Sequence, residues 1–101
     1  MAKYALYVPL EAKPGKDREI AAFLRSALPL VQDEPGTTSW FAMQEGAGRF
    51  AIFDTFDEED GREAHLNGKV AKALAEKFEE GALFANELQV FRLDVVADTL
   101  G

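Results

Sequence analysis

The chain has 101 residues, 48% of them hydrophobic and 29% charged, a composition typical of one globular domain, which we expect to span residues 1–101. A formal net charge of -7 at pH 7 makes the summed field repel nucleic acid backbones and anionic membrane surfaces, so neither is an expected partner. The absence of cysteine excludes disulfides, thiolate metal sites and cysteine nucleophiles.

The N-terminal segment predicts a β-strand and no targeting signal. MAKYALYVPL lacks the long apolar stretch and cleavage site of a secretory signal, so we expect a cytoplasmic protein whose mature chain starts here. No apolar run approaches the roughly 20 residues that a membrane span needs. Apolar residues on both parities from Lys3 to Leu10, followed by Pro14-Gly15, predict the strand.

An amphipathic helix is predicted from about Lys16 to Gln32. Apolar residues recur there at helical spacing, and charged residues are available for the opposite face. Pro29 lies inside the pattern, where proline removes a backbone hydrogen bond and clashes with the preceding turn, so we expect a kink or a break. Pro35-Gly36 ends the segment.

An antiparallel hairpin is predicted next. Thr37 to Glu45 is rich in threonine and aromatic residues, and Arg49 to Phe56 repeats this strand composition. Gly46-Ala47-Gly48 lies between the two segments and predicts the turn that joins them.

A second helical region and a last strand complete the chain. Asp57 is a suitable N-cap, and the acidic residues after it suit the first turn of a helix. Asn67-Gly68 is expected to interrupt this region and Gly81 to end its continuation. Leu88 to Val96 then predicts a fourth strand, before a loose tail from Ala97 to Gly101.

This order of elements corresponds to two βαβ halves, the split arrangement of ferredoxin-like domains. We therefore predict an α+β fold, β-α-β-β-α-β, with a four-stranded antiparallel sheet and both helical regions on one face. Apolar residues occupy alternating positions on both faces of the strands, so the sheet face away from the helices is also expected to be buried against something. We expect a homodimer packed sheet to sheet; the alternative is that these residues lie under loops or at strand ends. Examples are Phe50 and Ile52 against Ala51 and Phe53, and Trp40 against Phe41 and Met43.

Three ordered stretches carry a family resemblance: EPGTTSW from Glu34 to Trp40, FAIFDTFDEEDGREAHLNG from Phe50 to Gly68, and VAKAL from Val70 to Leu74. They resemble the antibiotic biosynthesis monooxygenase family of dimeric α+β barrels, in particular its quinol monooxygenase branch, and the likeness covers nearly all of the chain. The resemblance implies cofactor-independent oxygenation of a small aromatic, such as a quinol or polyketide-type phenol, in a pocket between sheet and helices. The scaffold also hosts haem degraders, isomerases and non-catalytic binding proteins, so the motifs are more specific for fold than for chemistry.

Two departures narrow what the resemblance implies. Relatives in the quinol branch often carry a second histidine five residues after the first, where this chain has Val70, so no relay of two histidines is available. The haem-degrading branch uses an Asn, Trp, His set, and the position of its tryptophan corresponds here to His65. Because the chain has no other histidine, we do not expect haem degradation.

His65 and Arg62 are the candidate catalytic residues. Histidine has an ordinary pKa near 6.5, so His65 could accept the proton of a bound phenol or quinol and ease electron transfer to oxygen. The alternative is a half-exposed helix histidine bonded to a carboxylate such as Glu58 or to a backbone carbonyl. Arg62 precedes His65 by three residues and could orient the ring or hold a substrate oxygen; alternatively it pairs with Glu58 or Glu59.

Five further residues are candidates for substrate binding. Trp40 could stack on a flat ring, although packing in the core or at a dimer interface explains it equally well. Phe41 and Phe53 could wall the pocket, or belong to ordinary core. Tyr7 and Asn67 could contact the ligand, and Asn67 is also explained as a residue that ends a helix.

Neither a metal nor a cofactor is expected. His65 with Asp54, Asp57 or Glu58 lacks recognisable ligand spacing, and we interpret these acids as capping and solubility residues. Three hypotheses remain: a cofactor-free monooxygenase-like dimer, a non-catalytic dimeric module that binds a small aromatic or hydrophobic ligand, and a structural subunit with a filled pocket. In the first, His65 accepts the proton, Arg62 orients it and Trp40 stacks on the substrate.

Overall fold

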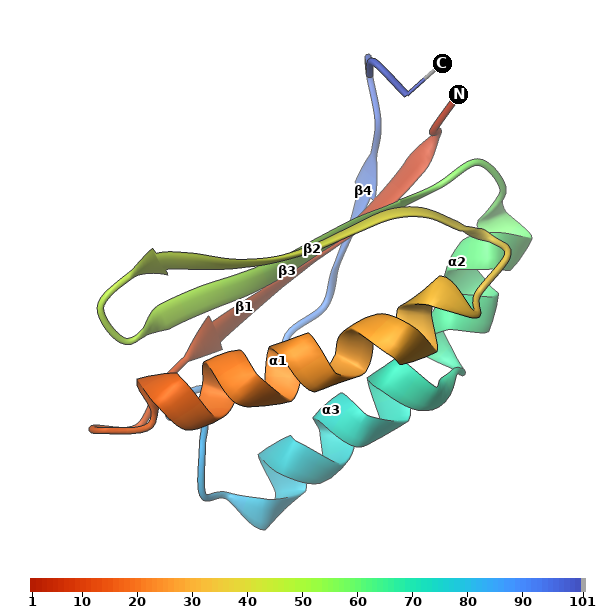
Figure 1. Cartoon of the computed structure of the whole chain (residues 1–101). Coiled ribbons are helices and arrows are strands. Elements are labelled where there is room, and N and C mark those ends of the chain that lie inside the picture. The colour runs from red at the N-terminus through yellow and green to blue at the C-terminus, as the bar shows by residue number, and fades with distance from the viewer. Residues whose placement is uncertain (101) are drawn as a thin grey trace.

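The structure is a computed structural model that describes residues 1–100, and within them four strands and three helices form a sheet with helices packed on it (Figure 1). The sheet is antiparallel throughout, with the strand order β2-β3-β1-β4. The predicted α+β class and ferredoxin-like order are therefore confirmed. The elements are β1 (Tyr4–Glu11), α1 (Asp17–Gln32), β2 (Thr37–Gly46), β3 (Arg49–Phe56), α2 (Glu59–Leu66), α3 (Lys69–Glu80) and β4 (Phe91–Asp94).

The helices cover one face of the sheet, and the main core lies between the helices and the sheet (Figure 1). Strands β1 and β3 pair from Tyr4 opposite Phe56 to Glu11 opposite Arg49, which fixes the parity of the side chains that meet the helices. Asp54 has this same inward parity and is almost fully buried. The central cluster contains Val8, Leu10, Ile20, Leu24, Phe50, Ile52, Leu74, Leu83 and Phe84.

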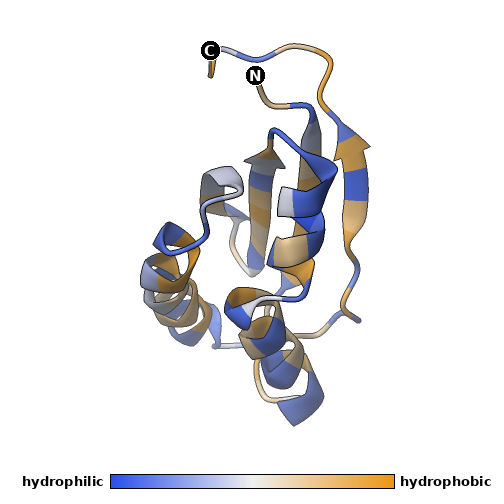
Figure 2. Cartoon of the chain, turned by 90° about the vertical axis from the view of Figure 1, so that its right-hand side faces the viewer, coloured by the Kyte–Doolittle hydropathy of each residue, from blue (hydrophilic) through white to orange (hydrophobic). Residues whose placement is uncertain are grey.

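The opposite face of the sheet is apolar and exposed. Phe41 on β2 is 53% exposed and Phe91 on β4 is 46% exposed, with Met43 and Leu93 beside them. Figure 2 shows the alternation of hydrophobic and hydrophilic residues along β4, the edge strand that leads to the C-terminus. We call this surface the outer face; it is the surface on which the expected homodimer would form, and that dimer stays a prediction.

Three local expectations were wrong. The break expected at Pro29 does not occur: helix α1 is continuous from Asp17 to Gln32, and Ala27 and Val31 on either side of the proline are buried. Helix α2 begins at Glu59 with Glu58, not Asp57, as its N-cap, because the Glu58 carbonyl accepts the backbone N–H groups of Gly61 and Arg62. The last strand is confined to Phe91–Asp94, the only part of the segment that pairs with β1.

Within residues 1–100 no helix is long and apolar enough to cross a lipid bilayer.

Candidate functional site

Two glycines bring the loop before β2 into contact with helix α2. A Cβ added to Gly36 would lie 2.8 Å from Gly61 Cα, and a Cβ added to Gly61 would lie 2.8 Å from the Gly36 carbonyl oxygen. Real side chains do not approach this closely, so both positions require glycine. The contact places Glu34, two residues before Gly36, beside His65 on α2.

His65 lies between two carboxylates. Its Nδ1 is 2.6 Å from Glu34 Oε1, and its Nε2 is 3.0 Å from Asp54 Oδ2 on β3. The residue is only 6% exposed, and the Phe56 ring packs against the imidazole with centroids 5.5 Å apart. Thr37 Oγ1 donates a 2.7 Å hydrogen bond to Glu34 Oε1. A carboxylate oxygen, which accepts hydrogen bonds, faces each ring nitrogen. The arrangement therefore favours the protonated imidazolium, which donates an N–H bond from both nitrogens.

The pKa values of Asp54 and His65 are both raised above their ordinary values. Burial by itself lowers the pKa of His65, but hydrogen bonding to Asp54 and Glu34 and their negative charges outweigh burial, and the net pKa is raised. Burial raises the pKa of Asp54, and the opposing effect of His65 only partly offsets this. Asp54 is therefore a stronger base, when ionised, than an exposed aspartate.

A small cavity, here called the inner cavity, lies between the sheet and helices α2 and α3. Its volume is about 50 Å³, and Asp54, His65 and Trp40 are its polar wall. Asp54 Oδ1 and Trp40 Nε1 are buried and have no hydrogen-bond partner within residues 1–100, although the two residues are directly opposite on β3 and β2. Such atoms are costly to bury unpaired. The apolar lining comprises Leu6, Val8, Ile52, Leu66, Val70, Ala71, Leu74, Leu88 and Val90.

The volume of the inner cavity limits what fits without movement. A cavity of about 50 Å³ has room for water-sized molecules, whereas pockets for drug-sized ligands measure roughly 300–1,000 Å³. Leu88 and Val90 close one side and lie in the segment before β4, which has no regular secondary structure.

A second hollow, here called the outer groove, lies on the surface between the loop before β2 and helix α2. Its volume is about 510 Å³, and Glu34, Thr37 and His65 line it together with the glycine contact. Asp33, Asp60 and Lys69 are the other ionisable residues in its lining. Within residues 1–100, His65 is the one residue that lines both the inner cavity and the outer groove.

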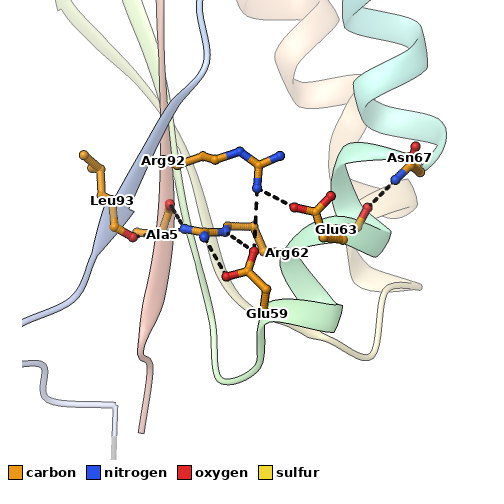
Figure 3. A network of polar contacts seen from close by, with 7 residues as sticks. All are labelled: Ala5, Glu59, Arg62, Glu63, Asn67, Arg92 and Leu93. Atoms are coloured by element: carbon orange, nitrogen blue, oxygen red, sulfur yellow. Dashed lines mark hydrogen bonds and ion pairs between the residues drawn. The ribbon is translucent and has the colours of Figure 1, made fainter.

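Arg62 belongs to a separate polar network (Figure 3). Its Nε and Nη2 donate to Glu59 at 3.0 and 2.7 Å, and its Nη1 donates to the carbonyl oxygens of Ala5 and Leu93 at 3.3 and 3.2 Å. The guanidinium carbon also lies 5.0 Å from the centroid of the Tyr4 ring. Arg62 thus joins α2 to β1 and β4, and its pairing with Glu59 is the alternative that the sequence left open. The ring of His65 is oriented by Glu34 and Asp54 instead.

Of the predicted substrate-binding residues, only Trp40 lies beside His65 in the inner cavity. Phe41, Phe53 and Tyr7 share the outward parity of the sheet and belong to the outer face. Phe41 also lines, together with Trp40, a separate hollow of about 390 Å³ between α1 and β2. The Tyr7 hydroxyl donates to Glu45 Oε2 at 3.0 Å, and this bond raises the pKa of Tyr7. Asn67 caps the end of α2 and donates from Nδ2 to the Glu63 carbonyl at 2.8 Å.

Sequence reasoning did not identify Glu34 as a partner of His65, and its interpretation of Asp54 as a capping or solubility residue was wrong, because Asp54 is buried within β3. Asp54 did carry a signal, because it alternates with Phe50, Ile52 and Phe56 on the inward parity of β3, where an acid is out of place. Glu34 carried no such signal, since it lies 31 residues before His65 in the sequence. The two carboxylates bind opposite nitrogens of one ring, and no group of three or more potential ligands in residues 1–100 could hold a metal ion.

The solved structure of NE2512 is similar to this chain in sequence as well as in fold. NE2512 is a protein of unknown function from Nitrosomonas europaea, with 44% sequence identity, a TM-score of 0.91, and coverage of 100% of this chain and 96% of that chain. This chain belongs to the same family as NE2512. The family is thus shown by sequence and structure together, while the name of that protein assigns no activity.

More distant structures share the fold. A putative antibiotic biosynthesis monooxygenase from Chloroflexus aurantiacus J-10-fl has 19% identity and a TM-score of 0.71, covering 97% of each chain. Another, from Caulobacter crescentus CB15, has 18% identity and a TM-score of 0.78, covering 95% of this chain and 92% of that chain. No protein-family model matches the sequence, and no curated protein matches it. The chain therefore has the fold of proteins named as antibiotic biosynthesis monooxygenases.

Proposed function

We propose that this protein is a cofactor-independent monooxygenase that oxidises a small aromatic molecule, such as a quinol or a polyketide-type phenol. One observation carries the proposal: the inner cavity has a buried acceptor, Asp54 Oδ1, and a buried donor, Trp40 Nε1, and neither has a partner. A phenolic hydroxyl both donates and accepts a hydrogen bond. It would therefore satisfy both atoms at once, while the aromatic ring contacts the apolar lining.

The chemistry starts with transfer of the phenolic proton to Asp54 Oδ1. The resulting phenolate gives one electron to dioxygen more readily than the phenol does, and the two radicals then form a carbon–oxygen bond. Asp54 returns its proton to the outer oxygen of the resulting peroxide anion. The oxygen–oxygen bond then breaks as the ring carbon loses its hydrogen as a proton, and this proton combines with the released hydroxide to form water. One oxygen atom enters the product and the other becomes water, so the substrate supplies all the electrons and no external reductant is needed.

In this proposal the residues have roles different from those that the sequence suggested. Asp54 replaces His65 as the group that contacts the substrate proton, because both ring nitrogens of His65 already face carboxylates. Trp40 positions the substrate oxygen through its N–H group as well as through its ring. Leu88 and Val90 admit the substrate by moving aside.

The proposal includes a homodimer formed through the outer face. Phe41, Met43, Phe91 and Leu93 form an exposed apolar surface that the helices of the same chain do not cover. A charge at its centre, as in Phe41→Glu, should give a monomer in sedimentation velocity experiments at micromolar concentration, whereas the wild type should sediment as a dimer. A wild type that sediments as a monomer would remove this part of the proposal.

A second candidate function is a non-catalytic module that binds a small aromatic or hydrophobic ligand. Its supporting observation is that His65 has no free ring nitrogen and the inner cavity is small, so the polar atoms could recognise a hydroxyl group without reacting. Under this alternative a phenol binds and dioxygen is not consumed.

Oxygen uptake distinguishes the two functions. We would measure uptake with a panel of reduced quinones and anthrones for the wild type, for Asp54→Asn, and for the control Asp57→Asn, whose carboxylate is at the surface near the N-terminal ammonium group. Asp54→Asn should lower kcat by roughly 100-fold or more, because the proton acceptor is lost, while the control retains wild-type turnover. Binding without uptake would support the second function, and neither binding nor uptake would contradict both.

A further inference from the structure

His65 forms the wall between the buried inner cavity and the surface-accessible outer groove. Asp54 lines only the cavity, Glu34 lines only the groove, and His65 lines both. The three side chains contact in that order, with 3.0 Å from Asp54 Oδ2 to His65 Nε2 and 2.6 Å from His65 Nδ1 to Glu34 Oε1. The cavity lining within residues 1–100 contains no ionisable side chain besides Asp54 and His65.

We propose that Asp54, His65 and Glu34 form a proton relay that keeps the charge beside the inner cavity constant: as Asp54 gains the substrate proton, His65 gives a proton to the outer groove through Glu34, which exchanges with solvent. The relay rests on the proposed function, because Asp54 gains and then returns a proton during the oxidation, and the release and return of the His65 Nδ1 proton offset that change of charge. Asp54 is the catalytic base in this scheme, and Glu34 acts through His65 as a positioning and proton-transfer residue.

The relay is balanced over one catalytic cycle. On the outward path, the substrate O–H bond breaks as Asp54 Oδ1 gains the proton, His65 gives its Nδ1 proton to Glu34 Oε1, and Glu34 releases a proton to water in the groove. On the inward path, Glu34 takes a proton from water and restores it to His65 Nδ1, while Asp54 gives its proton to the peroxide oxygen. Each group ends the cycle in the state in which it began.

Several features fix Glu34 in this position. The side chain is 19% exposed, so its carboxylate is held against His65 and still reaches the groove. Thr37 Oγ1 donates to the same oxygen that contacts the ring. A Cβ added to Gly68 would lie 3.2 Å from Glu34 Oε2, so glycine at this position leaves room for the carboxylate. These contacts come from the loop before β2, from β2 and from the turn after α2, independently of the cavity.

The other charged groups near the relay do not offer a competing path. Asp33, Asp60 and Lys69 line the groove, but no hydrogen bond or ion pair within residues 1–100 joins them to His65. Asp33 is next to Glu34 in sequence and lies in the same groove lining. It therefore provides a matched control position, where the same loss of charge should not interrupt the relay.

A test that needs no substrate uses the only tryptophan of the chain, Trp40, which lines the inner cavity opposite Asp54. We would follow Trp40 fluorescence in a stopped-flow jump from about pH 9 to about pH 6, a range in which a histidine with a raised pKa gains its proton. In Glu34→Gln the relaxation should slow roughly tenfold or more, because the amide cannot carry a proton. Asp33→Asn should relax at the wild-type rate, and Glu34→Asp should recover part of the loss. Equal rates in the wild type and Glu34→Gln would overturn the relay.

Turnover separates failure of the relay from failure of the proposed function. If the wild type oxidises a phenol, Glu34→Gln should lower kcat with little change in KM and should change the pH profile of kcat, whereas an unchanged profile would overturn the relay alone. If the wild type oxidises nothing but Glu34→Gln still slows the fluorescence relaxation, the relay stands and the monooxygenase proposal fails. Circular dichroism of each variant checks that it is folded.

Discussion

Helix α2 presents two buried basic side chains, Arg62 and His65, to different surroundings. Arg62 is 7% exposed and His65 is 6% exposed, and each contacts carboxylates. Arg62 directs its donors at Glu59 and at the carbonyl oxygens of Ala5 and Leu93 (Figure 3). His65 instead borders two hollows, and its partner Asp54 keeps one buried oxygen unpaired.

The difference indicates how to separate a structural cation from a candidate proton carrier. A buried charge with all of its donors paired stabilises the fold and has nothing left for a ligand. A buried charge in a chain of groups with an unpaired atom at one end and solvent at the other can move a proton. The same helix therefore contains one residue of each kind.

The largest expected effect on stability comes from Arg62. Arg62→Leu removes the group that donates to the Ala5 and Leu93 carbonyl oxygens and leaves Glu59 with only its longer contact to Arg92. It should lower the free energy of unfolding by about 3 kcal/mol in urea titrations. Arg92→Leu removes a half-exposed partner of the same acidic cluster and should lower stability much less, because solvent screens exposed ion pairs. Equal losses in the two variants would mean that the buried bonds of Arg62 are not important for stability.

The glycine contact should show a smaller effect. Gly61→Ala forces a Cβ to within 2.8 Å of the Gly36 carbonyl, so the loop carrying Glu34 must move away from α2. We expect a loss of about 1–3 kcal/mol and a lower pKa of His65, measured by urea titration and by NMR. Gly46→Ala is the control, since nothing lies within 4 Å of a Cβ added there. If His65 titrates in Gly61→Ala as it does in the wild type, the contact does not position Glu34.

The smallest effect is a pH dependence of stability. The pKa of His65 is raised in the folded protein, so its contribution to stability is fully present below its unfolded value of about 6.5 and is lost as the pH rises through the folded value. The pKa of Asp54 is also raised in the folded protein, so its contribution to stability is likewise lost as the pH rises, beginning at a lower pH than for His65. The stability difference between the wild type and His65→Gln should therefore shrink as the pH is raised from about 6 to about 9. A difference that grows over this range would contradict the ion pairs.

The fold could be predicted because its signals are local. Apolar spacing, the two Pro-Gly turns and the glycine hairpin each act over a few residues, and together they fix the element order. The unbroken α1 was not predictable in this way, since burial of Ala27 and Val31 against other elements outweighs the cost of Pro29. The N-cap of α2 was misplaced by one residue because several neighbouring acids suit that position.

The candidate site was predictable only in part. His65 and Trp40 were selected by residue type and resemblance, and the structure brings them to one cavity. The partners of His65 depend on contacts between distant segments, which no local pattern contains. Phe41, Phe53 and Tyr7 were assigned to the pocket, but the register of the strands directs them to the outer face.

The most direct test of this account is the protonation state of His65 by nitrogen-15 NMR, because the single histidine of the chain gives one unambiguous imidazole. At pH 7 we expect both ring nitrogens to be protonated, with chemical shifts of an imidazolium that donates to Glu34 and Asp54. In Glu34→Gln and in Asp54→Asn the midpoint of the titration should fall. A neutral imidazole with one free nitrogen at pH 7 in the wild type would contradict the charged arrangement on which both the proton acceptor and the relay depend.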